Sequence, residues 1–339
     1  MSAHALSTLI GVRLPLIQAP MAGSQGAALA LAVCAAGGLG SLPAAMLTPE
    51  ALQAELQRLR SQAAGPWNVN FFCHTPPKLD AAAESRWRAA LQPFYDEAGI
   101  DPASVPAGAG RVPFSHAIAD VVEPFAPPVV SFHFGLPAPD LLARVKSWGS
   151  RVLSSATTVE EAQWLEAHGA DAVIAQGLEA GGHRGMFLTD DLNTQSGLMT
   201  LLPQVVAAVK LPVIAAGGIA TPAGVRAARA LGAAAVQVGT AYLRTPEATT
   251  SKVHRAALAQ ARGEQTALTR LFSGRPARGL MNRLMRELGP MSELAPAFPL
   301  ATAGLAPLRS AAEALDSGDF SPLWAGQHVA AAREISAAD

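Results

Sequence analysis

The sequence has 339 residues, of which 50% are hydrophobic and 15% are charged, and its formal net charge at pH 7 is −1. This length suits one large domain or two medium ones, and the composition predicts a large buried core. Because no long run of one charge is present, we expect neither a nucleic-acid partner nor a polybasic membrane anchor. Cys34 and Cys73 are the only cysteines, too few for a disulfide framework or a four-cysteine metal site, and we expect no metal.

The first sixteen residues lack the basic start and the long apolar core of a signal peptide. No apolar run in the sequence is long enough to span a bilayer. We therefore expect a soluble, cytoplasmic protein without a membrane partner.

Short β-rich runs alternate with helical stretches along the chain. The predicted strands are residues 15–19, 38–41, 67–72, 129–134, 151–155, 172–175, 213–216 and 235–238. Most are continuous apolar runs, which is typical of parallel strands that helices cover on both faces. The α/β pattern predicts a (β/α)₈ TIM barrel. An open doubly wound sheet is disfavoured, because residues 21–26 after the first strand do not fit the Gly-x-Gly-x-x-Gly pattern.

Several residues predict where helices begin and end between these strands. Thr48 and Thr221 each precede a proline, which suits a hydroxyl cap with proline at the first helical position. Thr158 has a glutamate three residues later, the spacing of a capping box. Gly169 and Gly232 lie just before predicted strands, where glycine commonly ends a helix.

Two regions do not follow the strand–helix alternation. Residues 75–128 form an insertion after the third strand, within a barrel domain that spans residues 1–248. Residues 249–339 continue as helices and a proline-rich segment at 289–307, and predict a smaller, mainly helical subdomain that packs on the barrel. Either region could form a lid or contribute to the subdomain.

The stretch from Gly177 to Gly185 combines four glycines with His183, directly after the sixth predicted strand. Glycines let the backbone turn sharply and approach a flat or anionic ligand, and a histidine exchanges a proton near neutral pH. We interpret this stretch as part of a cofactor site in which His183 acts on the ligand. Glu179 suits a structural role better, since a carboxylate in a turn commonly binds backbone amides.

Other polar and glycine residues fall at the ends of predicted strands, where TIM barrels bind their ligands. They are Asn70, His133, Gln176, Gly217, Gly218 and the run Gln237, Val238, Gly239 and Thr240. Glycine turns after the seventh and eighth strands are typical of a phosphate site, because free N–H groups and a helix dipole point at the anion. His133 fits a buried core histidine and a second active-site residue equally well.

Six segments resemble, in order, the motifs of the nitronate monooxygenase family. They are 18–23 (QAPMAG), 36–40 (AGGLG), 68–70 (NVN), 176–183 (QGLEAGGH), 215–219 (AAGGI) and 237–240 (QVGT). The resemblance covers residues 13–248, and residues 274–278 extend it. It implies an FMN-dependent TIM barrel with a smaller helical subdomain. Residues 323–327 resemble the bacterial branch of the family, without an assigned role.

Carried over to this sequence, the resemblance implies a set of FMN contacts. They are Met21, Asn70, Gln176, Gly181, Gly182, Gly217, Gly218, Gln237, Val238, Gly239 and Thr240. The phosphate would bind at Gly217–Gly218 and Gly239–Thr240. His183 would lie beside the flavin ring, with His133 as the second catalytic candidate.

The reaction that the resemblance implies is oxidation of alkyl nitronates, such as propionate 3-nitronate, by molecular oxygen to carbonyl compounds and nitrite. A protonated His183 would bind the nitronate oxygens, whereas a neutral His183 would remove the α-proton of a nitroalkane. The main alternative is an FMN-dependent NAD(P)H reductase of quinones or enoyl thioesters. A flavin-storage protein is a further alternative. A flavin-free sugar-phosphate barrel is another, although no predicted strand ends in the lysine that it would use. A homodimer is possible.

Overall fold

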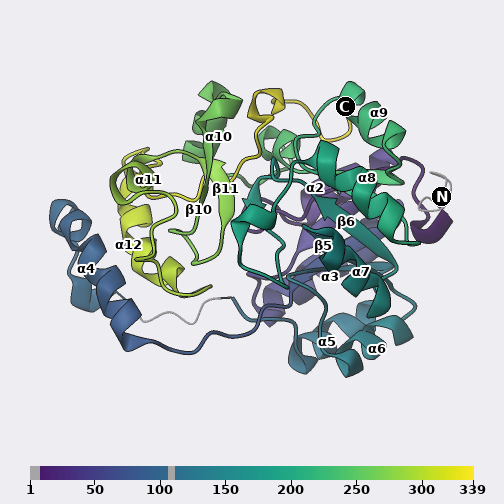
Figure 1. Cartoon of the computed structure of the whole chain (residues 1–339), viewed down its shortest axis with the longest axis horizontal. Helices are drawn as coiled ribbons and strands as arrows, with labels where there is room; N and C mark the ends of the chain where they lie inside the picture. The colour runs from purple at the N-terminus through teal and green to yellow at the C-terminus, as the bar shows by residue number, and fades with distance from the viewer. Residues whose placement is uncertain (1–7, 106–110) are drawn as a thin grey trace.

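The structure is a computed structural model that describes residues 8–105 and 111–339, and a parallel β-barrel forms its larger lobe (Figure 1). The barrel strands are β1 (Leu16–Gln18), β2 (Gly40–Pro43), β3 (Trp67–Phe72), β4 (Val129–His133), β5 (Arg151–Ala156), β6 (Ala172–Gln176), β8 (Val213–Ala216) and β9 (Ala235–Val238). Their order is β1-β9-β8-β6-β5-β4-β3-β2. Backbone hydrogen bonds of 2.9 Å from Gln18 to Leu39 and from Leu39 to Leu16 join the two end strands. The TIM-barrel prediction is confirmed, and each predicted strand overlaps an observed one.

Helices lie between successive strands and cover the outside of the barrel. They are α2 (Ala27–Ala36), α3 (Pro49–Gln62), α5 (His116–Val122), α6 (Pro139–Ser147), α7 (Val159–Ala167), α8 (Leu198–Ala208) and α9 (Pro222–Ala230). Short 3₁₀ turns are η1 (Pro102–Ser104), η2 (Glu123–Phe125), η3 (Leu192–Thr194), η4 (Thr240–Arg244), η5 (Gly263–Gln265) and η6 (Val329–Ala331).

The predicted helix ends are confirmed by their hydrogen bonds and backbone angles. Thr48, Thr158 and Thr221 begin α3, α7 and α9, and each hydroxyl accepts an N–H from the residue three positions later. Gly169 and Gly232 follow α7 and α9 with φ of 97° and 99°, the left-handed conformation that favours glycine. These ends fix where each strand begins and therefore where its carboxyl end lies.

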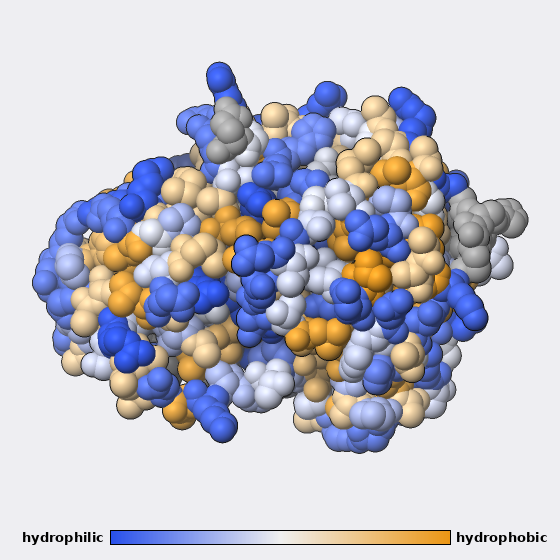
Figure 2. Space-filling view, in the orientation of Figure 1, coloured by the Kyte–Doolittle hydropathy of each residue, from blue (hydrophilic) through white to orange (hydrophobic). Residues whose placement is uncertain are grey.

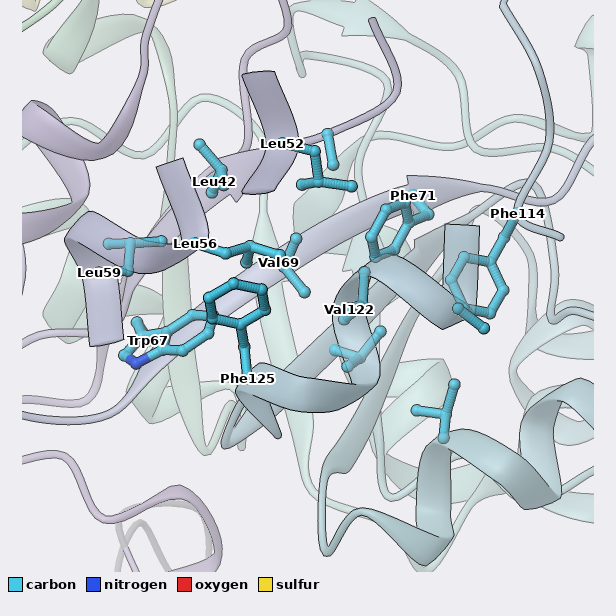
Figure 3. Close-up of a cluster of buried hydrophobic side chains, with 14 of the residues drawn as sticks. Leu42, Leu52, Leu56, Leu59, Trp67, Val69, Phe71, Phe114, Val122 and Phe125 are labelled. Carbon is cyan, nitrogen blue, oxygen red and sulfur yellow. The ribbon is translucent and has the colours of Figure 1, made fainter. Parts of the chain in front are cut away.

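Buried apolar side chains fill the space between the strands and their covering helices. Figure 3 shows one such cluster, in which leucines of α3 pack against β3 and the chain around α5. Its labelled members are Leu42, Leu52, Leu56, Leu59, Trp67, Val69, Phe71, Phe114, Val122 and Phe125. Burying one leucine of this kind contributes about 1.5–3 kcal/mol. This packing makes the strand ends a rigid platform for a site.

The smaller lobe contains α4 (Ala81–Ala98), α10 (Lys252–Gln260), α11 (Arg283–Leu288) and α12 (Ala301–Ala314). Helix α4 belongs to the predicted insertion, yet it packs along α12 near the other end of the sequence (Figure 1). The indole N–H of Trp87 donates to Ala301 O at 3.2 Å, and the hydroxyl of Tyr95 donates to Gly304 O at 2.7 Å. The subdomain is therefore assembled from two distant segments of the chain.

A three-stranded antiparallel sheet connects the smaller lobe to the barrel, and the sequence analysis did not predict it. Its strands are β10 (Thr266–Thr269), β11 (Ala277–Leu280) and β7 (Gly182–His183), in the order β10-β11-β7. Residues 249–339 are thus not helical throughout. Because Ala277 pairs with His183, the sheet attaches the subdomain to the glycine-rich stretch after β6.

The face of the molecule in Figure 2 is mostly hydrophilic, with apolar residues in small separate groups. In residues 8–105 and 111–339, no helix has the length and apolar character needed to cross a membrane.

Candidate active site

A cavity opens at the carboxyl ends of the barrel strands and collects nearly all the predicted site residues. The predicted residues that line it are Met21, Asn70, His133, Gln176, Gly181, Gly182, His183, Gly217, Gly218, Gln237, Gly239 and Thr240. No aspartate or glutamate from the described part of the chain lines this cavity. Arg111 is the only arginine or lysine among the described residues that line it. The cavity therefore favours an anionic ligand.

Val238 is the one predicted contact that does not line the cavity. Its side chain packs in a core cluster, while its carbonyl accepts a hydrogen bond of 2.8 Å from the N–H of Ala19. Successive side chains of a strand point to opposite faces, so Gln237 reaches the cavity and Val238 does not. Val238 holds β9 against the end of β1.

Glycine turns after β8 and β9 form one wall of the cavity. Gly217 and Gly218 have φ of 123° and 66°, so residues with a Cβ would be strained there. The backbone N–H groups of Gly218, Gly239 and Thr240 donate to no acceptor among the described residues. Free amide N–H groups at the carboxyl ends of strands are suited to bind a phosphate.

A segment near the C-terminus, residues 323–328, crosses beside these turns; we call it the C-terminal strap. The N–H of Gly326 donates to Thr240 Oγ1 at 2.9 Å, and the N–H of Gln327 donates to Glu179 O at 3.0 Å. His328 Nδ1 donates to the carbonyl of Gly218 at 3.0 Å. The sequence analysis named residues 323–327 without a role, and the structure makes them a wall of the cavity.

Glu179 has the structural role that the sequence analysis favoured. Its two carboxylate oxygens each lie 2.9 Å from the N–H of Leu198, the first residue of α8. A negative charge at a helix N-terminus is stabilising, because it meets unpaired N–H groups and the positive end of the helix dipole. Glu179 thus ties the glycine-rich stretch to α8.

Gln176 fixes the conformation of the chain around His183. Its Oε1 accepts from the N–H of Gly185 at 2.8 Å, and its Nε2 donates to His183 O at 3.0 Å. Arg184 is 1% exposed and donates to the carbonyls of Gly177 and Gln176 at 2.7 and 2.8 Å. By contrast, the side-chain amide of Gln237 has no hydrogen-bond partner among the described residues. Gln237 is therefore the glutamine whose amide remains available to a ligand.

The ring of His183 lies among aromatic side chains. Ring-centroid distances to Phe72, Phe298 and Trp324 are 6.3, 5.4 and 5.5 Å. Its Nε2 is 2.8 Å from Oγ of Ser273, which leaves Nδ1 without a partner in the described residues. Burial, and then the charge of Arg111, lower the pKa of His183 well below its ordinary value. His183 is therefore neutral near pH 7.

His133 supports His183 from the end of β4. Its Nε2 lies 3.2 Å from the carbonyl of His183 and therefore donates, so Nδ1 accepts from the hydroxyl of Ser155 at 3.0 Å. Burial lowers the pKa of His133 to about 4. Both ring nitrogens are occupied by protein groups, an arrangement that orients the His183 backbone. The predicted acid–base role of His133 would require one of these bonds to break.

Several residues of the site were missed in the sequence analysis. Arg111 comes from the predicted insertion, and Phe298, Trp324 and Ser273 come from the subdomain. His74 is 5% exposed and donates from Nε2 to Arg111 O at 3.1 Å. Except for His74, these residues lie far from the barrel strand ends in sequence. The local signals were the resemblances at residues 274–278, next to Ser273, and at residues 323–327, which contain Trp324.

The comparisons with known proteins agree with this geometry. The family model described as nitronate monooxygenase matches residues 3–339. A nitronate monooxygenase of Pseudomonas aeruginosa is 42% identical over 336 residues, covering 98% of this chain and 95% of the relative. The structure of a nitroalkane oxidase from Streptomyces ansochromogenes has a TM-score of 0.89 and 41% identity, covering 98% of this chain and 94% of that one. FabK from Thermotoga maritima is more distant, with a TM-score of 0.73 and 28% identity, covering 98% of this chain and 91% of that one. The chain belongs to the nitronate monooxygenase family.

Proposed function

We propose that this protein is an FMN-dependent enzyme that oxidises alkyl nitronates with molecular oxygen to carbonyl compounds and nitrite. The observation that supports it most is His183, a neutral histidine in a cavity that no described carboxylate lines, close to glycine turns whose amide N–H groups have no acceptor among the described residues. A nitronate and a flavin phosphate are both anions, and this cavity suits both. The membership of the nitronate monooxygenase family supports the same reaction.

The residues present fit FMN. Free N–H groups at Gly218, Gly239 and Thr240 would hold the phosphate. The unpartnered amide of Gln237 would meet the polar edge of the ring system, since an amide both donates and accepts. The further proposed contacts are Met21, Asn70, Gln176, Gly181, Gly182 and Gly217. When bound, FMN supplies the redox chemistry by accepting electrons from the nitronate carbon, while oxygen completes the reaction.

We propose that His183 binds the nitronate by a hydrogen bond from its neutral ring. A histidine whose pKa is far below 6.5 is a weak proton acceptor, so it is poorly suited to deprotonate a neutral nitroalkane. A neutral ring still donates one N–H, and Ser273 orients it through Nε2. Aromatic rings lie on several sides of it, and a hydrogen bond in such a low-dielectric environment is stronger than in water. The preferred substrate is therefore the preformed nitronate.

An anaerobic titration tests the proposed function. We expect the purified protein to be yellow and to release FMN on denaturation, and propyl nitronate should reduce the flavin without oxygen. A colourless protein that cannot be reconstituted with FMN would overturn the proposal. Rapid bleaching by NADH, with none by the nitronate, would instead favour the reductase of quinones or enoyl thioesters.

A further inference from the structure

Arg111 is a cation in the cavity wall that has no ionic partner. No carboxylate of the described chain lies within ion-pair distance of its guanidinium, and burial alone lowers its pKa. Its side-chain hydrogen bonds are long: 3.4 Å to Thr302 Oγ1 and 4.0 Å to the sulfur of Met46. A guanidinium carries five N–H donors in a planar fork. Most of the donors of Arg111 therefore remain available to a ligand.

The surroundings of Arg111 hold it in place without neutralising it. His74 donates to its carbonyl at 3.1 Å, which fixes the backbone. The guanidinium carbon lies 5.7 Å from the ring centroid of Phe298, a cation–π contact. Met46 follows β2 and Thr302 is in α12, so the guanidinium lies where the barrel meets the subdomain.

The position of Arg111 is next to His183 and distinct from the glycine turns. Phe298 contacts both residues, with its ring centroid 5.4 Å from that of His183. The glycine turns instead contact Ala180, Glu179 and the C-terminal strap. No residue contacts both Arg111 and these turns among the described contacts. A phosphate at the turns would therefore leave Arg111 unpaired.

We infer that Arg111 determines substrate specificity by binding the carboxylate at the far end of a substrate such as propionate 3-nitronate. This inference rests on the proposed function. The planar fork of arginine matches a carboxylate through two parallel hydrogen bonds. Arg111 and His183 line the same cavity and both lie against Phe298, so a substrate with its nitronate group at His183 can direct its tail to Arg111.

Paired substrates and variants test this inference in the holoenzyme. Propionate 3-nitronate has a carboxylate tail, whereas propyl nitronate has a methyl end. We expect Arg111→Gln to raise KM for propionate 3-nitronate by about 10- to 100-fold, the typical value of a charge-assisted hydrogen bond. Its kcat/KM for propyl nitronate should stay within about twofold. Arg286→Gln removes an exposed positive charge from α11 and is the matched control; it should leave KM and kcat/KM unchanged for both substrates.

The outcomes separate this inference from the proposed function. If wild-type enzyme oxidises neither nitronate, the proposed function fails. Suppose instead that the wild-type enzyme oxidises both nitronates. If Arg111→Gln then lowers kcat/KM equally for the two substrates, or for neither of them, Arg111 does not bind the tail and the inference is wrong. Should Arg111→Gln not fold, Arg111→Lys replaces it, since it keeps the charge but loses the planar fork. Arg111→Lys should raise KM for propionate 3-nitronate alone, and an equal effect on both substrates would again overturn the inference.

Discussion

Buried histidines determine the chemistry of the cavity at the scale of single residues. Burial lowers the pKa of His74 and His133 to about 4 and that of His183 further, so all three are neutral at physiological pH. His74 and His133 donate to backbone carbonyls, of Arg111 and His183 respectively. We therefore interpret both as positioning residues, each behind one residue that faces the substrate.

Replacing His183 should separate substrate binding from cofactor binding. In His183→Asn we expect FMN content close to wild type, because the glycine turns and Gln237 remain. The value of kcat/KM for propyl nitronate should fall about 100-fold or more, the usual effect of losing a positioned acid–base or hydrogen-bonding side chain. Steady-state oxygen uptake measures this loss. His168→Asn, at the exposed position directly after α7, is the matched control. Unchanged turnover in His183→Asn would show that His183 does not face the substrate.

At the scale of elements, the C-terminal strap makes close contacts with the glycine-rich stretch. A Cβ at position 181 would lie 2.5 Å from Gly326 N and 2.6 Å from the carbonyl carbon of Ala325. Real Cβ atoms do not approach backbone so closely, so any side chain at Gly181 must displace the strap. The strap is bonded to Thr240 and Glu179, so its displacement disturbs the turn proposed to hold the phosphate.

We predict that Gly181→Ala weakens FMN binding by about tenfold or more. The physical cause is steric displacement of the C-terminal strap, which also costs the hydrogen bonds that it makes. The dissociation constant of FMN, measured by flavin fluorescence, checks the prediction. Gly65→Ala is the matched control, since a Cβ there would have no neighbour closer than 3.9 Å. Equal FMN affinity in Gly181→Ala and wild type would contradict this account of the strap.

The elements also show what the sequence could predict. The barrel strands were found because most of them are continuous apolar runs, and their ends located the cavity residues. Strand β7 was missed because it has only two residues and pairs with a distant segment that contains Ala277. Strands β10 and β11 have four residues each and pair with each other across residues 270–276. Val238 was predicted as part of a run, yet it does not line the cavity because alternate residues of a strand face opposite sides. Its contact with the cofactor stays a prediction.

The placement of Arg111 is the clearest limit of prediction at the site. It follows a stretch rich in glycine and proline, without periodicity that predicts its direction. Its position depends on His74, Phe298 and Thr302, which are separated from it by many residues. A contact that only the folded chain creates leaves no local pattern in the sequence.

At the scale of the whole molecule, the buried neutral histidines make stability depend on pH. His254 is 6% exposed, donates to Trp324 O at 3.1 Å, and has a pKa lowered by burial to about 4. In the unfolded chain its pKa returns to about 6.5. As pH falls from 6.5 towards 4, the unfolded state takes up a proton that the folded state does not. The contribution of neutral, buried His254 to the free energy of unfolding is therefore lost on acidification. The same holds for the contributions of His74 and His133.

We predict that the free energy of unfolding falls as pH is lowered from 6.5 to 4.5, with each such histidine contributing up to about 1.4 kcal/mol per pH unit. His254→Gln removes one titrating group and keeps a donor for Trp324 O, so its stability should depend less steeply on pH in this window. Above pH 7 the slopes of variant and wild type should coincide. Urea unfolding at a series of fixed pH values measures the free energy of unfolding of the variant and of the wild type. Parallel slopes between pH 6.5 and 4.5 would show that His254 is not buried in its neutral form.

The homodimer that the sequence analysis named stays a prediction.

The two-part subdomain and the C-terminal strap have a consequence for synthesis of the protein. The ribosome makes α4 long before α12. Trp87 and Tyr95 of α4 therefore lack their contacts with Ala301 and Gly304 until α12 has been synthesised. The strap that completes the wall beside Thr240 is made later still. A nascent chain can thus close its barrel while its cofactor site lacks a wall. If the cavity holds FMN as proposed, the wall beside Thr240 is complete only after the strap has been made, so binding of FMN is a late event.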